Sequence, residues 1–231
     1  MAGLTIWPLL FVVPGMATLS YNSLLPYIAL DTQGASEPLM VAMINFSVRE
    51  LCLQSGCWNK HEDIAIVSGQ SDYSPTVPTG AKVRYVRSIL LNNNREITPA
   101  SEDHLLYYKR DAFAAIGSPL YFYMLDDGKF RLLPKPADND SGLVMNVRTV
   151  FVPEFEATVF DSDLLEKYAE TIVSGAKAKL MEMPAKAWSN PNLAAYHKQV
   201  FNDGVSKARI DVELSNVGSI MKVKARNFKG V

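Results

Sequence analysis

The chain has 231 residues, of which 48% are hydrophobic and 20% charged, a composition typical of a globular protein of one or two domains and too apolar for a disordered chain. Lys and Arg number 23 against 24 Asp and Glu, so a net charge of −1 excludes a general attraction to nucleic acid or to an anionic membrane. The two cysteines, Cys52 and Cys57, are too few for a disulfide framework, and Cys57 with His61 lacks the further ligands of a structural zinc site. We therefore expect neither a metal nor a cofactor.

Residues 1–35 begin with an apolar run from Leu4 to Val13 that is similar to the core of a signal peptide. No Lys or Arg precedes the run, Pro8 and Pro14 interrupt it, and it is too short to span a membrane. We expect an uncleaved apolar arm that packs on another surface, and no membrane partner.

Residues 36–62 are predicted to form the first helix of a small bundle. Ser36 is a favourable N-cap, Pro38 occupies a tolerated first-turn position, and the apolar face ends at Gly56. We expect Trp58 to cover the end of this helix. The face is wide enough to need two neighbouring helices, and its members are Leu39, Met40, Met43, Ile44, Val48, Leu51 and Cys52.

Residues 63–160 favour β-structure, because β-branched and aromatic residues dominate and turn residues recur. We expect a strand at 83–91, a turn at 92–95 and a return limb at 96–98. The strongest hairpin signal runs from Leu120 to Leu125, turns at Asp126, Asp127 and Gly128, and returns over 130–133.

The same segment predicts three further features. One or two helical turns are expected at 101–108, a polar loop at 134–142, and a last strand at 144–152.

Residues 161–210 predict a helical hairpin that completes the bundle. Pro184 separates helices expected from Asp163 to Met183 and from Asn190 to Arg209. The acidic residues Glu154, Glu156, Asp161 and Asp163 suit the start of the first helix, where the helix dipole favours negative charge. The first stripe is Leu165, Tyr168, Ile172, Ala176, Leu180 and Met183, and the second is Leu193, Tyr196, Val200, Gly204 and Ala208.

Gly175 lies in the middle of the first predicted helix, where a glycine costs roughly 1 kcal/mol relative to alanine. Close approach of another backbone would compensate this cost, and a merely tolerated glycine is the alternative. Together the segments predict an α+β fold in which a helical bundle, built from both ends of the chain, carries an inserted β-rich module and extended terminal arms.

Residues 211–231 are predicted to form an extended arm. From Ser215 onward there is no acidic residue, and basic and apolar residues alternate with the period of two that suits main-chain pairing with a partner. A disordered basic terminus is the alternative. The candidate partner-binding residues are Ile220, Met221, Lys222, Val223, Lys224, Arg226 and Phe228.

The sequence contains no internal repeat, phosphate-binding glycine loop or nucleophile elbow. The three histidines, His61, His104 and His197, are scattered among ordinary polar residues. Asp126 and Asp127 before a glycine are what a hairpin turn requires. We therefore expect no enzymatic activity.

The order of elements resembles the head-to-tail adaptor proteins of tailed phages, especially those with short tails. The resemblance covers Ser36 to Arg209 and depends on a pattern of apolar, glycine and proline positions. These are Leu51, Cys52 and Trp58; then Gly117, Pro119, Tyr121, Leu132, Pro134 and Pro136; and finally Gly175, Ala176, Ala178, Leu180, Met183, Pro184, Trp188, Asn190, Tyr196, Phe201 and Gly204.

This resemblance implies a structural virion protein, made in the host cytoplasm, that forms a ring of twelve copies between the portal protein and a downstream tail or nozzle protein. Genomic DNA would pass through the ring without specific binding, and no cofactor is implied. The residues 220–228 named above would then form a portal-binding arm. Two alternatives stay open: a tail-associated cell-wall hydrolase and an exported ligand-binding domain.

Overall fold

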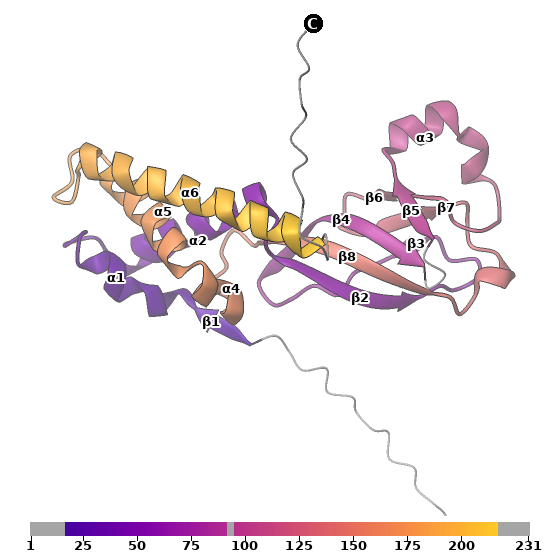
Figure 1. Cartoon of the computed structure of the whole chain (residues 1–231), viewed down its shortest axis with the longest axis horizontal. Coiled ribbons are helices and arrows are strands. Elements are labelled where there is room, and N and C mark those ends of the chain that lie inside the picture. The colour runs from indigo at the N-terminus through magenta and orange to yellow at the C-terminus, as the bar shows by residue number, and fades with distance from the viewer. Residues whose placement is uncertain (1–16, 92–94, 217–231) are drawn as a thin grey trace, which may run out of the picture.

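A computed structural model describes residues 17–91 and 95–216 and has an α+β fold, as the sequence predicts (Figure 1). Within these residues six α-helices accompany a curled seven-stranded sheet and a two-stranded sheet. Figure 1 shows most of the helices at one end of an elongated molecule and the seven-stranded sheet, with the short helix α3, at the other.

Helix α2 (Glu37–Ser55) begins and ends where the sequence predicts. Pro38 lies in its first turn, and Gly56 ends it in the left-handed conformation with a φ of 64°. The N–H of Gly56 donates to the carbonyl of Cys52 at 3.0 Å. Residues 59–62, which the sequence analysis assigned to the helical segment, instead form the start of strand β2, because the chain reverses at this glycine.

The helix predicted from Asp163 to Met183 is divided into α4 (Ser162–Lys167) and α5 (Ala169–Met181). The break falls at Tyr168, whose φ of −111° and ψ of 16° are not helical. The predicted buried stripe is nevertheless correct from Leu165 to Leu180. As expected for the acidic run, the Asp161 carboxylate caps α4 and accepts a hydrogen bond from the N–H of Leu164 at 3.1 Å.

Helix α6 (Pro191–Asn216) is longer than predicted. Residues 211–216, assigned to an extended arm, continue the helix because Val212 extends its buried stripe and is only 6% exposed. The stripe itself also differs from the prediction, since Tyr196 is exposed. The residues of α6 that are buried are Ala194, Phe201, Val205, Ala208 and Val212.

Residues 18–29, predicted as part of an arm, fold against the helices. Strand β1 (Thr18–Ser20) pairs antiparallel with β9 (Val159–Asp161), and a 3₁₀ turn η1 (Tyr21–Leu24) leads into α1 (Leu25–Ala29). Three side chains at three- and four-residue spacing, Tyr21, Leu24 and Ile28, enter the core. The remainder of the predicted N-terminal arm, 1–16, lies outside the described residues.

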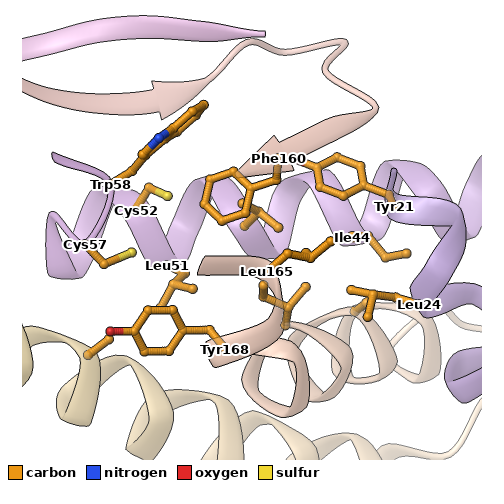
Figure 2. Packing of buried hydrophobic residues seen from close by; sticks show 14 of the residues in the cluster. Tyr21, Leu24, Ile44, Leu51, Cys52, Cys57, Trp58, Phe160, Leu165 and Tyr168 are labelled. Atoms are coloured by element: carbon orange, nitrogen blue, oxygen red, sulfur yellow. The ribbon is translucent and has the colours of Figure 1, made fainter. Parts of the chain in front are cut away.

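The main core lies between α2, α4, α5, α6 and the adjoining strands (Figure 2). Trp58, expected to cover the end of α2, is buried there, with its ring 4.8 Å from that of Phe160 and 6.1 Å from that of Phe151. Burying each such side chain contributes about 1.5–3 kcal/mol. This aromatic cluster joins the helical end of the molecule to the sheet.

The seven-stranded sheet has the order β2-β8-β4-β5-β6-β7-β3. The predicted strands and the strand pairing of both predicted hairpins are confirmed: β4 pairs antiparallel with β5, and β6 with β7. Most of the turn predicted at 92–95 lies outside the described residues. The strands are β2 (Asn59–Ala65), β3 (Asp72–Tyr73), β4 (Ala81–Leu91), β5 (Glu96–Pro99), β6 (Tyr121–Met124), β7 (Phe130–Leu133) and β8 (Val144–Pro153).

The curled sheet encloses a second core. Its members come from strands far apart in the sheet order, including Val147 of β8, Ile97 of β5 and Phe130 of β7. Beside it, α3 (Glu102–Tyr108) lies where one or two helical turns were expected, and Ser101 caps it. The 3₁₀ turn η2 (Arg110–Phe113), which was not predicted, follows it. The loop at 134–142 contains a further 3₁₀ turn, η3 (Asp138–Asp140).

Candidate interaction surfaces

The first surface is a groove of about 490 Å³ between α1, α5 and α6, which we call the α1–α5–α6 groove. Its apolar walls include Leu30, which is 73% exposed, and the exposed rings of Tyr27 and Tyr196. Ala169 and Val173 on α5 line its floor at a spacing of one helical turn. The complete lining is Tyr27, Leu30, Ala169, Glu170, Val173, Ser174, Lys177, Tyr196, His197 and Val200.

The charges of this groove are predominantly negative. Glu170 and Lys177 line the groove, and Asp31, which borders the groove outside its lining, forms an ion pair with Lys177. Burial and the nearby Lys177 lower the pKa of His197, so this ring adds no positive charge at neutral pH. The lining thus holds one carboxylate and one ammonium group, and the bordering Asp31 brings the local balance to two carboxylates against one ammonium group.

The second surface lies on the outward side of α2, and we call it the α2 patch. Phe46 and Leu53 are two turns apart on one side of the helix, and the ring of Phe155 lies 5.7 Å from that of Phe46. Asn45 holds this aromatic pair together, because its side-chain amide donates to the carbonyl of Phe155 at 2.6 Å. The patch comprises Phe46, Arg49, Glu50, Leu53, Gln54, Phe155 and Lys179.

The α2 patch carries mainly positive charge. Lys179 of α5 forms an ion pair with Glu50 at 2.6 Å, and Arg49 donates to the carbonyl of Pro153. Two cations thus accompany one carboxylate, the reverse of the balance in the α1–α5–α6 groove.

A third apolar surface lies on and beside α3, at the sheet end of the molecule (Figure 1). Tyr107 is 81% exposed, and its ring lies 4.7 Å from that of Tyr108. The other exposed apolar residues near it in sequence are Leu106, Ile116 and Leu120.

A hollow of about 640 Å³ brings together the carboxylates Asp126, Asp127 and Glu154, and Lys82 and Arg84 also line it. Asp126 and Asp127 occupy the hairpin turn, as predicted. The hydrogen bond from Lys129 lowers the pKa of the exposed Asp127 carboxyl. A general acid needs the opposite shift, so Asp127 is unsuited to the general-acid role in a carboxylate-dependent hydrolase.

The other candidate residues for chemistry form no single cluster within the described residues, although the thiols of Cys52 and Cys57 interact with each other. Cys52 and Cys57 are buried free thiols, His61 contacts the Asn146 amide, and the ring of His104 stacks near that of Tyr108. Within 17–91 and 95–216, no three His, Cys, Asp or Glu side chains are grouped so that they could hold a metal ion. Over the same residues, no helix has the length and apolarity needed to cross a membrane.

The predicted portal arm, Ile220, Met221, Lys222, Val223, Lys224, Arg226 and Phe228, lies outside the described residues. The groove and the α2 patch were not identified from the sequence. The positions of the apolar residues along the helices contained a usable signal. Phe46 and Leu53 are apolar residues of α2 outside its predicted buried face, which indicates a second, exposed apolar face. Tyr196 was wrongly predicted to be buried, which hid its place in the groove.

The described residues thus define an α+β protein whose notable features are exposed apolar surfaces. A comparison with protein families matches residues 19–220 to the family described as SU10 adaptor protein. The match covers most of the chain, and the chain belongs to this family of phage head-to-tail adaptor proteins. It is accordingly a structural component of a phage particle, in a family whose members contact portal and tail proteins. A comparison with curated proteins gave no match.

Proposed function

We propose that this adaptor forms a ring, of twelve copies, that joins the portal protein to the downstream tail or nozzle protein and extends the DNA channel. The observation that carries the proposal is the family match over residues 19–220. In this arrangement α2, α5 and α6 form a small bundle that lies beside the same bundle in neighbouring copies.

The proposed ring lets DNA pass without binding it specifically. A net charge of −1 supports this part of the proposal, because a strongly basic lumen would hold the phosphate backbone and release counterions on binding. The charged residues near the hairpin turn are of both signs, as Lys82 and Arg84 accompany Asp126 and Asp127.

We further propose that the C-terminal segment is the portal-binding arm. The sequence from 217 to 231 has four basic and no acidic residues, and its apolar residues Ile220, Met221 and Phe228 are the proposed anchors. Burial of each would contribute about 1.5–3 kcal/mol before ordering costs, whereas an exposed ion pair contributes about 1 kcal/mol or less.

A binding measurement between the full chain and purified portal rings tests this proposal. Truncation should follow Asn216, the last residue of α6, because an end before Asp211 would remove Val212 from the core and Asp211 from its ion pair with Lys167. We expect the truncated chain to stay folded and lose portal binding, and Phe228→Ala to weaken binding more than Lys229→Ala. Undiminished binding of the truncated chain would refute the role of the arm.

A further inference from the structure

The α1–α5–α6 groove and the α2 patch lie on opposite sides of the same helix. Lys177 lines the groove and Lys179 belongs to the α2 patch. These residues are two positions apart, and at 100° per residue they point in directions about 200° apart around α5. A copy of the chain therefore presents one surface to one side and the other surface to the opposite side.

The two surfaces differ in charge. Both expose apolar side chains: Tyr27, Leu30 and Tyr196 at the groove, and Phe46, Leu53 and Phe155 at the α2 patch. In the groove Lys177 is paired with the bordering Asp31, which leaves the carboxylate of Glu170. In the α2 patch Lys179 is paired with Glu50, which leaves the guanidinium of Arg49. The groove is thus net negative and the patch net positive, which makes them electrostatically complementary.

We propose that the α2 patch of one copy docks on the α1–α5–α6 groove of the next, so that the occupant of the groove is a second copy of this chain. The pairing rests on the proposed ring function and specifies which surfaces make the ring contact. Because the two surfaces are unlike and face in opposite directions, the contact is heterologous and repeats from copy to copy. Groove-to-groove or patch-to-patch pairing would bring together surfaces of like net charge.

Crosslinking of single introduced thiols tests this pairing. Leu30→Cys places an exposed thiol in the groove and Leu53→Cys places one in the α2 patch, while the native Cys52 and Cys57 are buried and the parent chain serves as the control. With a short bis-maleimide, the full-length double variant should give a ladder of dimers, trimers and larger species. An equal mixture of the two single variants should give crosslinked dimers that contain one copy of each variant. Neither single variant alone should give more crosslinked product than the parent chain.

A charge reversal supplies a second measurement. Glu170→Lys should lower the yield of mixed dimers by about two- to fivefold, as expected for loss of an exposed attraction. Adding Lys179→Glu to the partner should restore part of the yield.

Dimers formed by one single variant alone, or a double variant that gives no more crosslinking than the parent, would overturn the proposed pairing. The crosslinking result and the portal-binding result can be interpreted separately. A chain that binds portal rings without the ladder would retain the adaptor function but assemble through other surfaces, whereas a ladder without portal binding would contradict the adaptor proposal and leave the pairing in place.

Discussion

Gly204 of α6 lies directly against Thr171 of α5: a Cβ added at position 204 would be 2.2 Å from the Thr171 hydroxyl oxygen. Gly175 of α5 makes a similar approach, since an added Cβ would be 2.6 Å from Phe201 Cδ2 and 2.9 Å from Ser47 Oγ. These two glycines set the distance between α5 and α6, and Gly175 also sets the distance to α2. The sequence predicted close approach of another backbone at Gly175, whereas the nearest atoms belong to the side chains of Phe201 and Ser47.

Gly175→Ala and Gly204→Ala should each destabilise the protein. Overpacking typically costs about 1–3 kcal/mol, and the better helix propensity of alanine returns about 1 kcal/mol, so we expect a net loss of up to about 2 kcal/mol. Urea unfolding measures this loss. Gly117→Ala is the matched control, because an added Cβ there meets nothing within 4 Å.

The Thr171 variant distinguishes overpacking from other effects of the substitution. Thr171→Ala removes the two atoms nearest to the added Cβ at position 204, so the double variant should recover part of the stability lost in Gly204→Ala. Strictly additive losses would mean that the Gly204 contact does not cause the destabilisation.

The elements with strong local signals were predictable from the sequence. Gly56 ends α2, and the turn at Asp126, Asp127 and Gly128 produces the hairpin, because both depend on residues adjacent in the chain. The pairing of β1 with β9 and the parallel pairing of β5 with β6 were not predictable, since these contacts join strands distant in sequence or separated by other elements. The groove was missed for the same reason, because its walls come from 27–30 and 169–200.

The ion pair between Asp72 and Arg131 should make stability depend on pH. Arg131 donates to the two carboxylate oxygens of Asp72 at 2.5 and 2.7 Å, joining β3 to β7. These hydrogen bonds hold the pKa of Asp72 below its ordinary value of 3.8. A lowered folded-state pKa stabilises the protein above the unfolded value, and this contribution disappears as the pH falls through the folded-state pKa.

Asp72→Asn should therefore cost about 1 kcal/mol or less at pH 7, because the pair is over one-third exposed, and should cost progressively less below pH 4. The measurement is the free energy of unfolding of Asp72→Asn and of the parent chain, from pH 7 down to about pH 3. An equal loss at every pH would show that the charge of Asp72 does not contribute.

Tyr21 buries a hydroxyl that has no hydrogen-bond partner among the described residues. Burial, together with Cys52, raises the pKa of this phenol above its usual range. Tyr21→Phe should leave stability unchanged or raise it by about 1 kcal/mol, because the cost of the buried hydroxyl is removed. Tyr73→Phe is the matched comparison and should destabilise, since the Tyr73 hydroxyl accepts from the N–H of Val67 at 3.1 Å and donates to the carbonyl of Gln70 at 3.2 Å. Thermal unfolding distinguishes the two variants.

The hydrolase alternative predicts a measurable activity at the hollow that contains Asp126 and Glu154. We expect the purified chain to release no soluble sugar fragments from peptidoglycan, with a known muramidase as the positive control. Release that disappears in a folded Asp126→Asn or Glu154→Gln variant would establish catalysis and contradict the purely structural account.

The most direct test of the central claim is cryo-electron microscopy of the head-to-tail junction in the assembled particle. The account predicts a closed ring of twelve copies between portal and tail, in which the α2 patch of each copy faces the α1–α5–α6 groove of the next and the C-terminal segment contacts the portal. A junction that lacks this chain, or a chain present there only as isolated copies that do not contact both portal and tail, would contradict it.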